Sequence, residues 1–111
     1  MTDPVPDDPL TISVGHLGDT ARVEVAGELD LHTSERLTEA VHEALETAPR
    51  VIEIDAAGLT FADSAGLRAL LVARDDAEAG GATLRLTAVS DTLDRLLEMT
   101  GLREVFGAPT A

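Results

Sequence analysis

Residues 51–71 read VIEIDAAGLTFADSAGLRALL, and this run sets the architecture of the chain. Its first part, Val51–Asp55, alternates apolar and polar side chains, which predicts a short strand. Apolar residues at helical spacing follow, and they predict a helix over about Ser64–Ala79 that stops at the Gly80-Gly81 pair. Ser64 therefore lies where a strand and its loop pass into a helix. Backbone N–H groups are free at such a position and carry partial positive charge.

Similar patterns extend over the rest of the chain. Alternating apolar and polar residues predict strands, and apolar residues three and four apart predict helices. In order, the predicted elements are a strand at 10–14, a strand at 22–27, a helix with its apolar stripe over 37–45, the strand at 51–55, the helix at 64–79, a strand at 83–87, a helix with its stripe over 93–97 and a short strand at 104–106. A turn at 16–19 makes the first two strands a hairpin.

Capping residues mark the ends of the predicted helices. Thr33 and Ser34 are candidate N-caps of the first helix, and Ser90 or Asp91 of the third, because their side-chain oxygens accept from free N–H groups. Gly101 is placed to end the third helix as the C′ residue of a Schellman motif.

The element order β-β-α-β-α-β-α predicts an α/β fold with a mostly parallel sheet of four to five strands. Every predicted strand alternates instead of being apolar throughout, so we expect helices mainly on one face of the sheet and a more polar opposite face. We expect residues 1–9 to be a disordered leader, 10–106 to be a single domain and 107–111 to be a flexible tail.

The amino-acid composition argues against several classes of binding partner. The chain has 111 residues, 44% of them hydrophobic, and its 21 acids against 8 bases give a net charge of −13. All the bases are arginine, and this balance argues against binding nucleic acid or an anionic membrane. There is no cysteine, no apolar run long enough to span a membrane and no signal-peptide pattern, so we expect a cytoplasmic protein with protein partners.

Ser64 could serve as a helix cap, a nucleophile or a phosphate acceptor. A hydrolase triad is disfavoured, because all three histidines precede Ser64 and the chain is short for that fold. The absence of lysine argues against a phospho-accepting receiver domain built on Asp55, and against a P-loop. The histidines lack metal-ligand spacing, so we expect neither a metal nor another cofactor.

A cap and a phosphate acceptor remain as alternatives for Ser64. A serine at a predicted helix start is usually a cap. The small neighbours Ala65 and Gly66, however, leave the hydroxyl little steric cover. Gly66 also costs about 1 kcal/mol in helix propensity relative to alanine, which indicates that something approaches the backbone closely there.

Three ordered motifs resemble the STAS domain family. Val25–Asp30 contains the sequence GELD, which resembles the element that follows the second strand of these domains. Leu59–Leu67 resembles their L-x-F-x-D-S-[small]-G-[LIV] element, and Met99–Leu102 resembles their closing x-[ST]-G-L. The spacing agrees over about residues 10–106, and the small stand-alone anti-sigma factor antagonists are the most similar members.

The resemblance implies a regulatory protein with no catalytic activity of its own. Such antagonists bind an anti-sigma factor that is also a serine kinase, and so release a sigma factor. The kinase phosphorylates the serine after the motif's aspartate, here Ser64, and a metal-dependent serine phosphatase reverses this. The partner-binding candidates are Asp30, Asp63, Ala65, Gly66 and Arg68. We expect a monomer.

The sequence departs from the family at two positions of the motif. Ala65 stands where many relatives have a second hydroxyl residue, and Arg68 stands where glycine is frequent. Arg68 therefore bears on the choice of partner more than on the mechanism. Asp30 and Asp63 could equally be loop acids that shape turns. The alternative function is that of a STAS subunit or scaffold of a larger assembly, such as a lipid-transport complex, with no phosphorylation cycle.

Overall fold

The computed structural model describes residues 8–110 of the chain. The elements, in chain order, are β1 (Leu10–Leu17), β2 (Thr20–Leu29), α1 (Ser34–Leu45), β3 (Val51–Ala62), α2 (Ser64–Ala79), β4 (Thr83–Val89), α3 (Asp91–Thr100) and the 3₁₀ helix η1 (Glu104–Phe106). The predicted order of strands and helices is confirmed up to α3.

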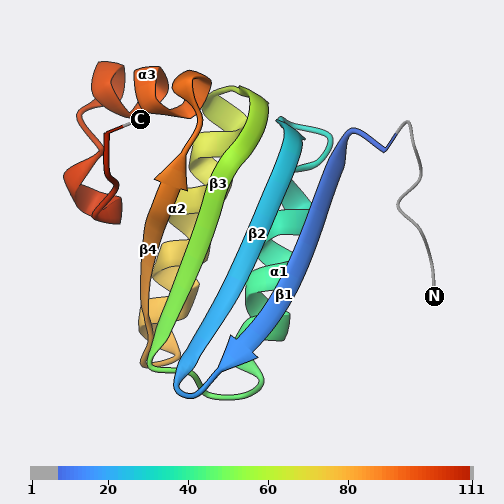
Figure 1. Cartoon of the computed structure of the whole chain (residues 1–111), viewed down its shortest axis with the longest axis vertical. Helices are drawn as coiled ribbons and strands as arrows, with labels where there is room; N and C mark the ends of the chain where they lie inside the picture. The colour runs from blue at the N-terminus through green and yellow to red at the C-terminus, as the bar shows by residue number, and fades with distance from the viewer. Residues whose placement is uncertain (1–7, 111) are drawn as a thin grey trace.

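The four strands form one sheet in the order β1-β2-β3-β4 (Figure 1). β1 and β2 are the predicted antiparallel hairpin, and the pairs β2–β3 and β3–β4 are parallel. The mostly parallel sheet is therefore confirmed, with four strands. The C-terminal ends of β2 and β3 consequently lie at the same edge of the sheet, where the loops to α1 and α2 begin.

All four strands are longer than the sequence pattern predicts. β1 continues to Leu17 and β4 to Val89, and the predicted turn at 16–19 is confined to Gly18 and Asp19. β3 has 12 residues instead of five, and β2 continues past Gly27 to Leu29.

The burial of β3 alternates as far as Ala56 and breaks at the two exposed residues Ala57 and Gly58, so the simple pattern ends there while the strand continues. Asp55 consequently lies in the middle of β3, where its carboxylate pairs with Arg22 at 3.0 Å.

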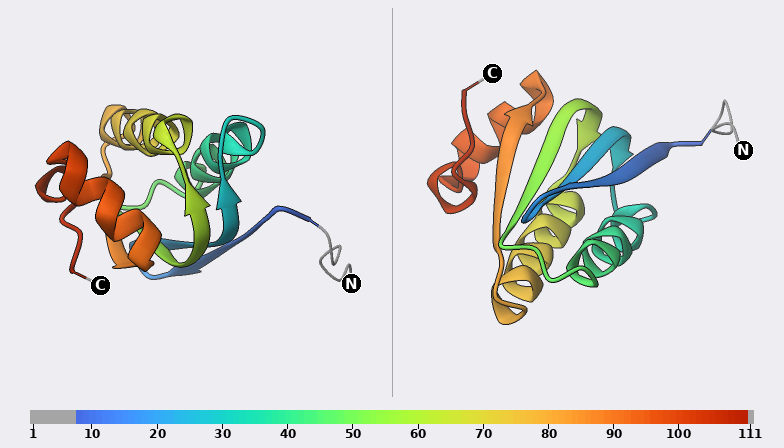
Figure 2. Two further views of the ribbon diagram at one scale, coloured as in Figure 1. Left: turned by 90° about the horizontal axis from the view of Figure 1, so that it is seen from above. Right: turned by 60° about the horizontal axis from the view of Figure 1, so that its bottom comes forward.

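The two faces of the sheet differ: helices cover one face, and the other face carries charged side chains. α1 and α2 lie side by side on one face, and α3 lies at the C-terminal end of β4 (Figures 1 and 2). The opposite face carries two cross-strand ion pairs, Arg22–Asp55 between β2 and β3 and Arg85–Glu53 between β4 and β3. The prediction of helices mainly on one face and a more polar second face is confirmed.

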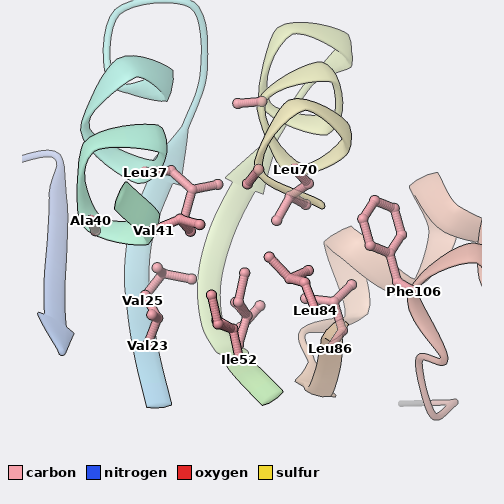
Figure 3. Close-up of a cluster of buried hydrophobic side chains, with 14 of the residues drawn as sticks. Val23, Val25, Leu37, Ala40, Val41, Ile52, Leu70, Leu84, Leu86 and Phe106 are labelled. Carbon is pink, nitrogen blue, oxygen red and sulfur yellow. The ribbon is translucent and has the colours of Figure 1, made fainter. Parts of the chain in front are cut away.

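The core lies between the sheet and the helices (Figure 3). Strand residues such as Val23, Ile52 and Leu86 point toward the buried stripe of α1 and α2, which includes Leu37 and Leu70. All five are at most 1% exposed, and burial of side chains this large contributes about 1.5–3 kcal/mol each. This packing fixes where α1 and α2 begin relative to the sheet.

The C-terminal region confirms the predicted caps and corrects one strand. The Ser90 hydroxyl accepts from the N–H of Leu93 at 3.2 Å, and Gly101 adopts the left-handed conformation with φ 71°. The N–H of Leu102 donates to the carbonyl of Leu97, which completes the Schellman motif. Residues 104–106 form η1 instead of a strand, because they turn to bury the Phe106 ring beside β4.

The N-terminal end of the described chain is attached to the domain. Residues 1–7 of the predicted leader lie outside the described residues. The two remaining residues make contacts: the Asp8 carboxylate pairs with Arg36 at 2.8 Å, and the Pro9 carbonyl accepts from Glu28 N–H at 2.7 Å. The predicted domain boundaries remain a prediction.

The Asp8 contact gives the fold a small acid-sensitive contribution. The hydrogen bond from Arg36, followed by that from the Leu10 N–H, lowers the pKa of the Asp8 carboxyl below its ordinary value of 3.8. This stabilisation is complete above the unfolded-state pKa and is lost as the pH falls through the lower folded-state pKa. We expect Asp8→Asn to be less stable than the wild type at pH 7, with the difference shrinking toward pH 3. Urea unfolding at both pH values measures this, and a constant difference would contradict it.

Candidate functional site

Ser64 is the first helical residue of α2, and its side chain is exposed. The cap of the helix is Asp63: its Oδ1 accepts from the Gly66 N–H at 2.9 Å. Within residues 8–110 the Ser64 hydroxyl makes no hydrogen bond, and neither its own N–H nor that of Ala65 has an acceptor. The hydroxyl is therefore accessible and lies beside two free backbone donors.

Gly66 holds the start of α2 against the end of β2. A Cβ at this position would lie 2.4 Å from the carbonyl oxygen of Leu29 and 2.9 Å from its Cγ. The same carbonyl accepts from the Asp63 N–H at 3.4 Å. The close approach inferred from the sequence is thus made by Leu29 of the same chain. Gly66 itself is buried and presents no side chain to a partner.

Asp30 organises the loop between β2 and α1. Its Oδ1 accepts from the N–H groups of His32 at 2.9 Å and Thr33 at 3.1 Å. The buried Thr33 hydroxyl donates to the Glu28 carbonyl at 2.8 Å and accepts from the Asp30 N–H at 3.0 Å. Thr33 occupies the N-cap position of α1, as predicted, but its side chain makes no capping hydrogen bond. The hydroxyl is instead engaged by these contacts within the loop. The predicted alternative cap, Ser34, is the first residue of α1.

A groove of about 250 Å³ runs between α1 and α2 and starts beside Ser64. Ala65 and Arg68 line it on the α2 side, as does the exposed Val72. Its other side begins with Leu31, whose side chain is 73% exposed. Sequence patterns did not identify Leu31 or Val72, because the two residues are 41 positions apart and meet only through helix packing.

Arg68 is exposed on α2 and has no ion pair among the described residues. Five other arginines are paired with acids. An arginine without an intramolecular acid retains its full capacity for a bidentate contact with a carboxylate or phosphate. Arg68 therefore gives this end of an acidic molecule an uncompensated cation.

The histidines lie apart from Ser64. The His42 ring contacts Asp76 at 2.8 Å, and the His16 ring contacts the Thr47 hydroxyl at 3.3 Å. Over residues 8–110, no histidine hydrogen-bonds to Ser64, and no three acids or histidines form a group that could hold a metal ion. Nor does that part of the chain contain a helix with the length and apolar character needed to cross a membrane.

Two substitutions of Asp63 distinguish its structural role as the cap of α2 from the role of its charge. We expect Asp63→Ala to lower the free energy of unfolding by about 1 kcal/mol, because the Gly66 N–H loses its acceptor. Asp63→Asn keeps an acceptor oxygen, so we expect it to retain most of the stability while losing the charge. Urea denaturation compares the three proteins. Equal stability of Asp63→Ala and wild type would contradict the assigned cap.

Known proteins share sequence with this chain over most of its length. The sequence model of the family described as "Mlab, STAS domain" matches residues 12–107. An anti-sigma-B factor antagonist of Staphylococcus aureus is 30% identical over 83 residues, which cover 75% of this chain and 77% of that protein.

Two solved structures show a similar fold. An anti-sigma factor antagonist from Mycobacterium paratuberculosis has a TM-score of 0.80 at 24% identity, covering 96% of this chain and 90% of that one. The Bacillus cell fate determinant SpoIIAA in its phosphorylated form has a TM-score of 0.68 at 23% identity, covering 91% of each chain. With the family model matching most of its length, the chain belongs to the STAS domain family.

Proposed function

We propose that this protein is an anti-sigma factor antagonist whose binding is controlled by phosphorylation of Ser64. In its unphosphorylated form it binds an anti-sigma factor that is a serine kinase, and the sigma factor is released. The kinase transfers phosphate to Ser64 and the complex dissociates. A serine phosphatase restores the binding form. The antagonist itself performs no catalysis and acts as a monomer.

The observation that carries this proposal is the state of the Ser64 hydroxyl. Because Asp63 serves as the cap, the hydroxyl is not needed to satisfy the helix, and it is exposed. A kinase can therefore reach it without unfolding α2. The likeness to antagonists in sequence, and to a structure described as phosphorylated, supports the same role.

The fold can accommodate a phosphate at this position. The first two N–H groups of α2 are unbonded within the described chain, and a helix N-terminus favours an anion by about 0.3–1 kcal/mol at an exposed site. The Asp63 carboxylate lies one residue away and is held by its cap bond. A phosphate adds about −1.5 to −2 charges next to it, which concentrates negative charge where the partner docks.

The other candidate residues differ in what they offer a partner. Ala65 and Arg68 line the open groove and are available for contact. The side chains of Asp30 and Asp63 already accept hydrogen bonds from their own loops, and Gly66 is buried. We therefore assign direct contact to Ala65 and Arg68, and assign to the other three the shaping of the surface around Ser64.

A pair of bait proteins tests the proposal. Ser64→Ala, which cannot be phosphorylated, should retain an ATPase-fold serine kinase from extracts of the source organism, and Ser64→Glu should retain much less of it. The recovered kinase is then produced in recombinant form for the measurements below. Recovery of transport-complex components by both baits equally would instead support the alternative of a STAS scaffold without a phosphorylation cycle.

A further inference from the structure

The groove between α1 and α2 is lined by two exposed apolar side chains, and it begins next to Ser64. Leu31 is 73% exposed and Val72 is 41% exposed, although both line the same hollow. Exposed apolar side chains that gather in one place on a soluble protein mark an interaction site more often than scattered ones do. The groove also begins at Ala65, next to the serine that the kinase must reach.

The size of the groove favours an inserted side chain over a small molecule. Its volume is about 250 Å³, below the roughly 300–1,000 Å³ typical of sites for drug-sized ligands. Two of its lining residues, Ala65 and Ala69, have small side chains, which leaves room for a side chain from another protein to enter between the two helices.

A charged residue on each side of the groove indicates which residues of the partner would flank the inserted side chain. Arg68 projects from α2 and Glu35 from α1, and neither has an ion pair among residues 8–110. A fitting segment therefore carries an acidic residue toward α2 and a basic residue toward α1, on either side of an apolar residue. Such complementary charges fix register and partner choice more than raw affinity.

We infer that this groove is a docking site for the anti-sigma factor kinase, which inserts an apolar side chain between Leu31 and Val72 and places an acidic residue on Arg68. The inference rests on the proposed function and deepens it. It assigns affinity and partner choice to the groove, separately from the hydroxyl of Ser64 that accepts phosphate. Docking here places the kinase directly over the start of α2.

The test measures binding of the recombinant kinase by titration calorimetry in the Ser64→Ala background, where no phosphate is transferred. Leu31→Asp and Val72→Asp each place a charge where an apolar contact is expected, and each should weaken binding at least tenfold. The matched control is Leu17→Asp, at a side chain 86% exposed on the last residue of β1, at the other end of the sheet, and it should bind within twofold of the parent. Thermal unfolding of each variant checks that the fold is retained.

A charge reversal tests the polar part of the inference. Arg68→Glu should weaken kinase binding severalfold at low salt and less at high salt, because exposed charges are screened. Arg50→Glu makes the same change in the loop before β3, at the opposite end from Ser64, and should have no effect.

The outcomes separate the groove from the proposed function. If the kinase phosphorylates Ser64 but the groove variants bind it as tightly as their controls, the inference is wrong and the proposed function stands. If Leu17→Asp weakens binding as much as Val72→Asp, the docking surface lies elsewhere and the inference is equally overturned. If Ser64 accepts no phosphate from the kinase that the parent protein binds, the proposed function fails, whatever the groove variants do.

Discussion

Phosphorylation of Ser64 is expected to weaken binding of the kinase by about 100-fold relative to the unphosphorylated protein. Two unit charges about 5 Å apart at an effective dielectric of about 20 interact with about 3 kcal/mol. This energy corresponds to roughly a 100-fold change in affinity. The added charge lies next to the Asp63 carboxylate and at the entrance of the groove that begins with Ala65. The repulsion that weakens binding acts between the phosphate and the acidic residue that the kinase is inferred to place on Arg68, so it is local and requires no rearrangement of the fold.

Calorimetric titration of kinase into three proteins measures this effect. Ser64→Ala is expected to bind as the unphosphorylated wild type does, and the phosphorylated wild type to bind about 100-fold more weakly. Ser64→Glu carries less charge than a phosphate and is expected to fall between them. Ser13→Ala, at the exposed serine of β1, is the matched control and is expected to change nothing. Equal affinity of the phosphorylated and unphosphorylated forms would show that phosphate does not control binding.

Gly66→Ala is expected to destabilise the protein by about 2–3 kcal/mol, although alanine is the better helix former. The added Cβ would lie 2.4 Å from a backbone oxygen of Leu29, at the end of a paired strand. A backbone atom held by the sheet cannot move aside as a flexible side chain can. Either α2 shifts away from β2, or β2 loses its last pairing with β3.

Thermal and urea unfolding compare Gly66→Ala with Gly15→Ala. A Cβ at Gly15 in β1 meets no atom within 4 Å, so this control is expected to be neutral or slightly stabilising. A loss of about 2–3 kcal/mol lowers the melting temperature by roughly 10–20 °C in a domain of this size. If Gly66→Ala were as stable as the control, the close contact with Leu29 would not exist in solution, and the placement of Ser64 relative to β2 would have to be revised.

The sequence predicted correctly those elements whose formation depends on residues close together in the chain. The helical stripe of α2 and the glycine end of α3 were both recognisable, because periodicity and capping depend on neighbouring residues. The extension of β3 was not. It passes through Gly58, where a Cβ would lie 2.8 Å from the Cβ of Ala26, so the absence of a side chain reflects contact with β2. In the sequence alone, the same glycine resembled part of a loop.

The sequence predicted only part of the candidate site, because the rest depends on contacts between segments that are distant in the chain. Ser64 was identified by its position between a strand and a helix, but Asp63 and Ser64 are both acceptable caps. Only the geometry shows that Asp63 takes this role and leaves the hydroxyl unbonded within the described chain. The groove could not be found from the sequence, because Leu31 and Val72 belong to different segments that the sheet brings together.

Intact-mass spectrometry of the protein after incubation with the kinase and ATP tests the central claim most directly. The wild type should gain the mass of one phosphoryl group, Ser13→Ala should gain the same, and Ser64→Ala should gain none. Incorporation into Ser64→Ala equal to that of the wild type would contradict the account, because the acceptor would then be a different side chain.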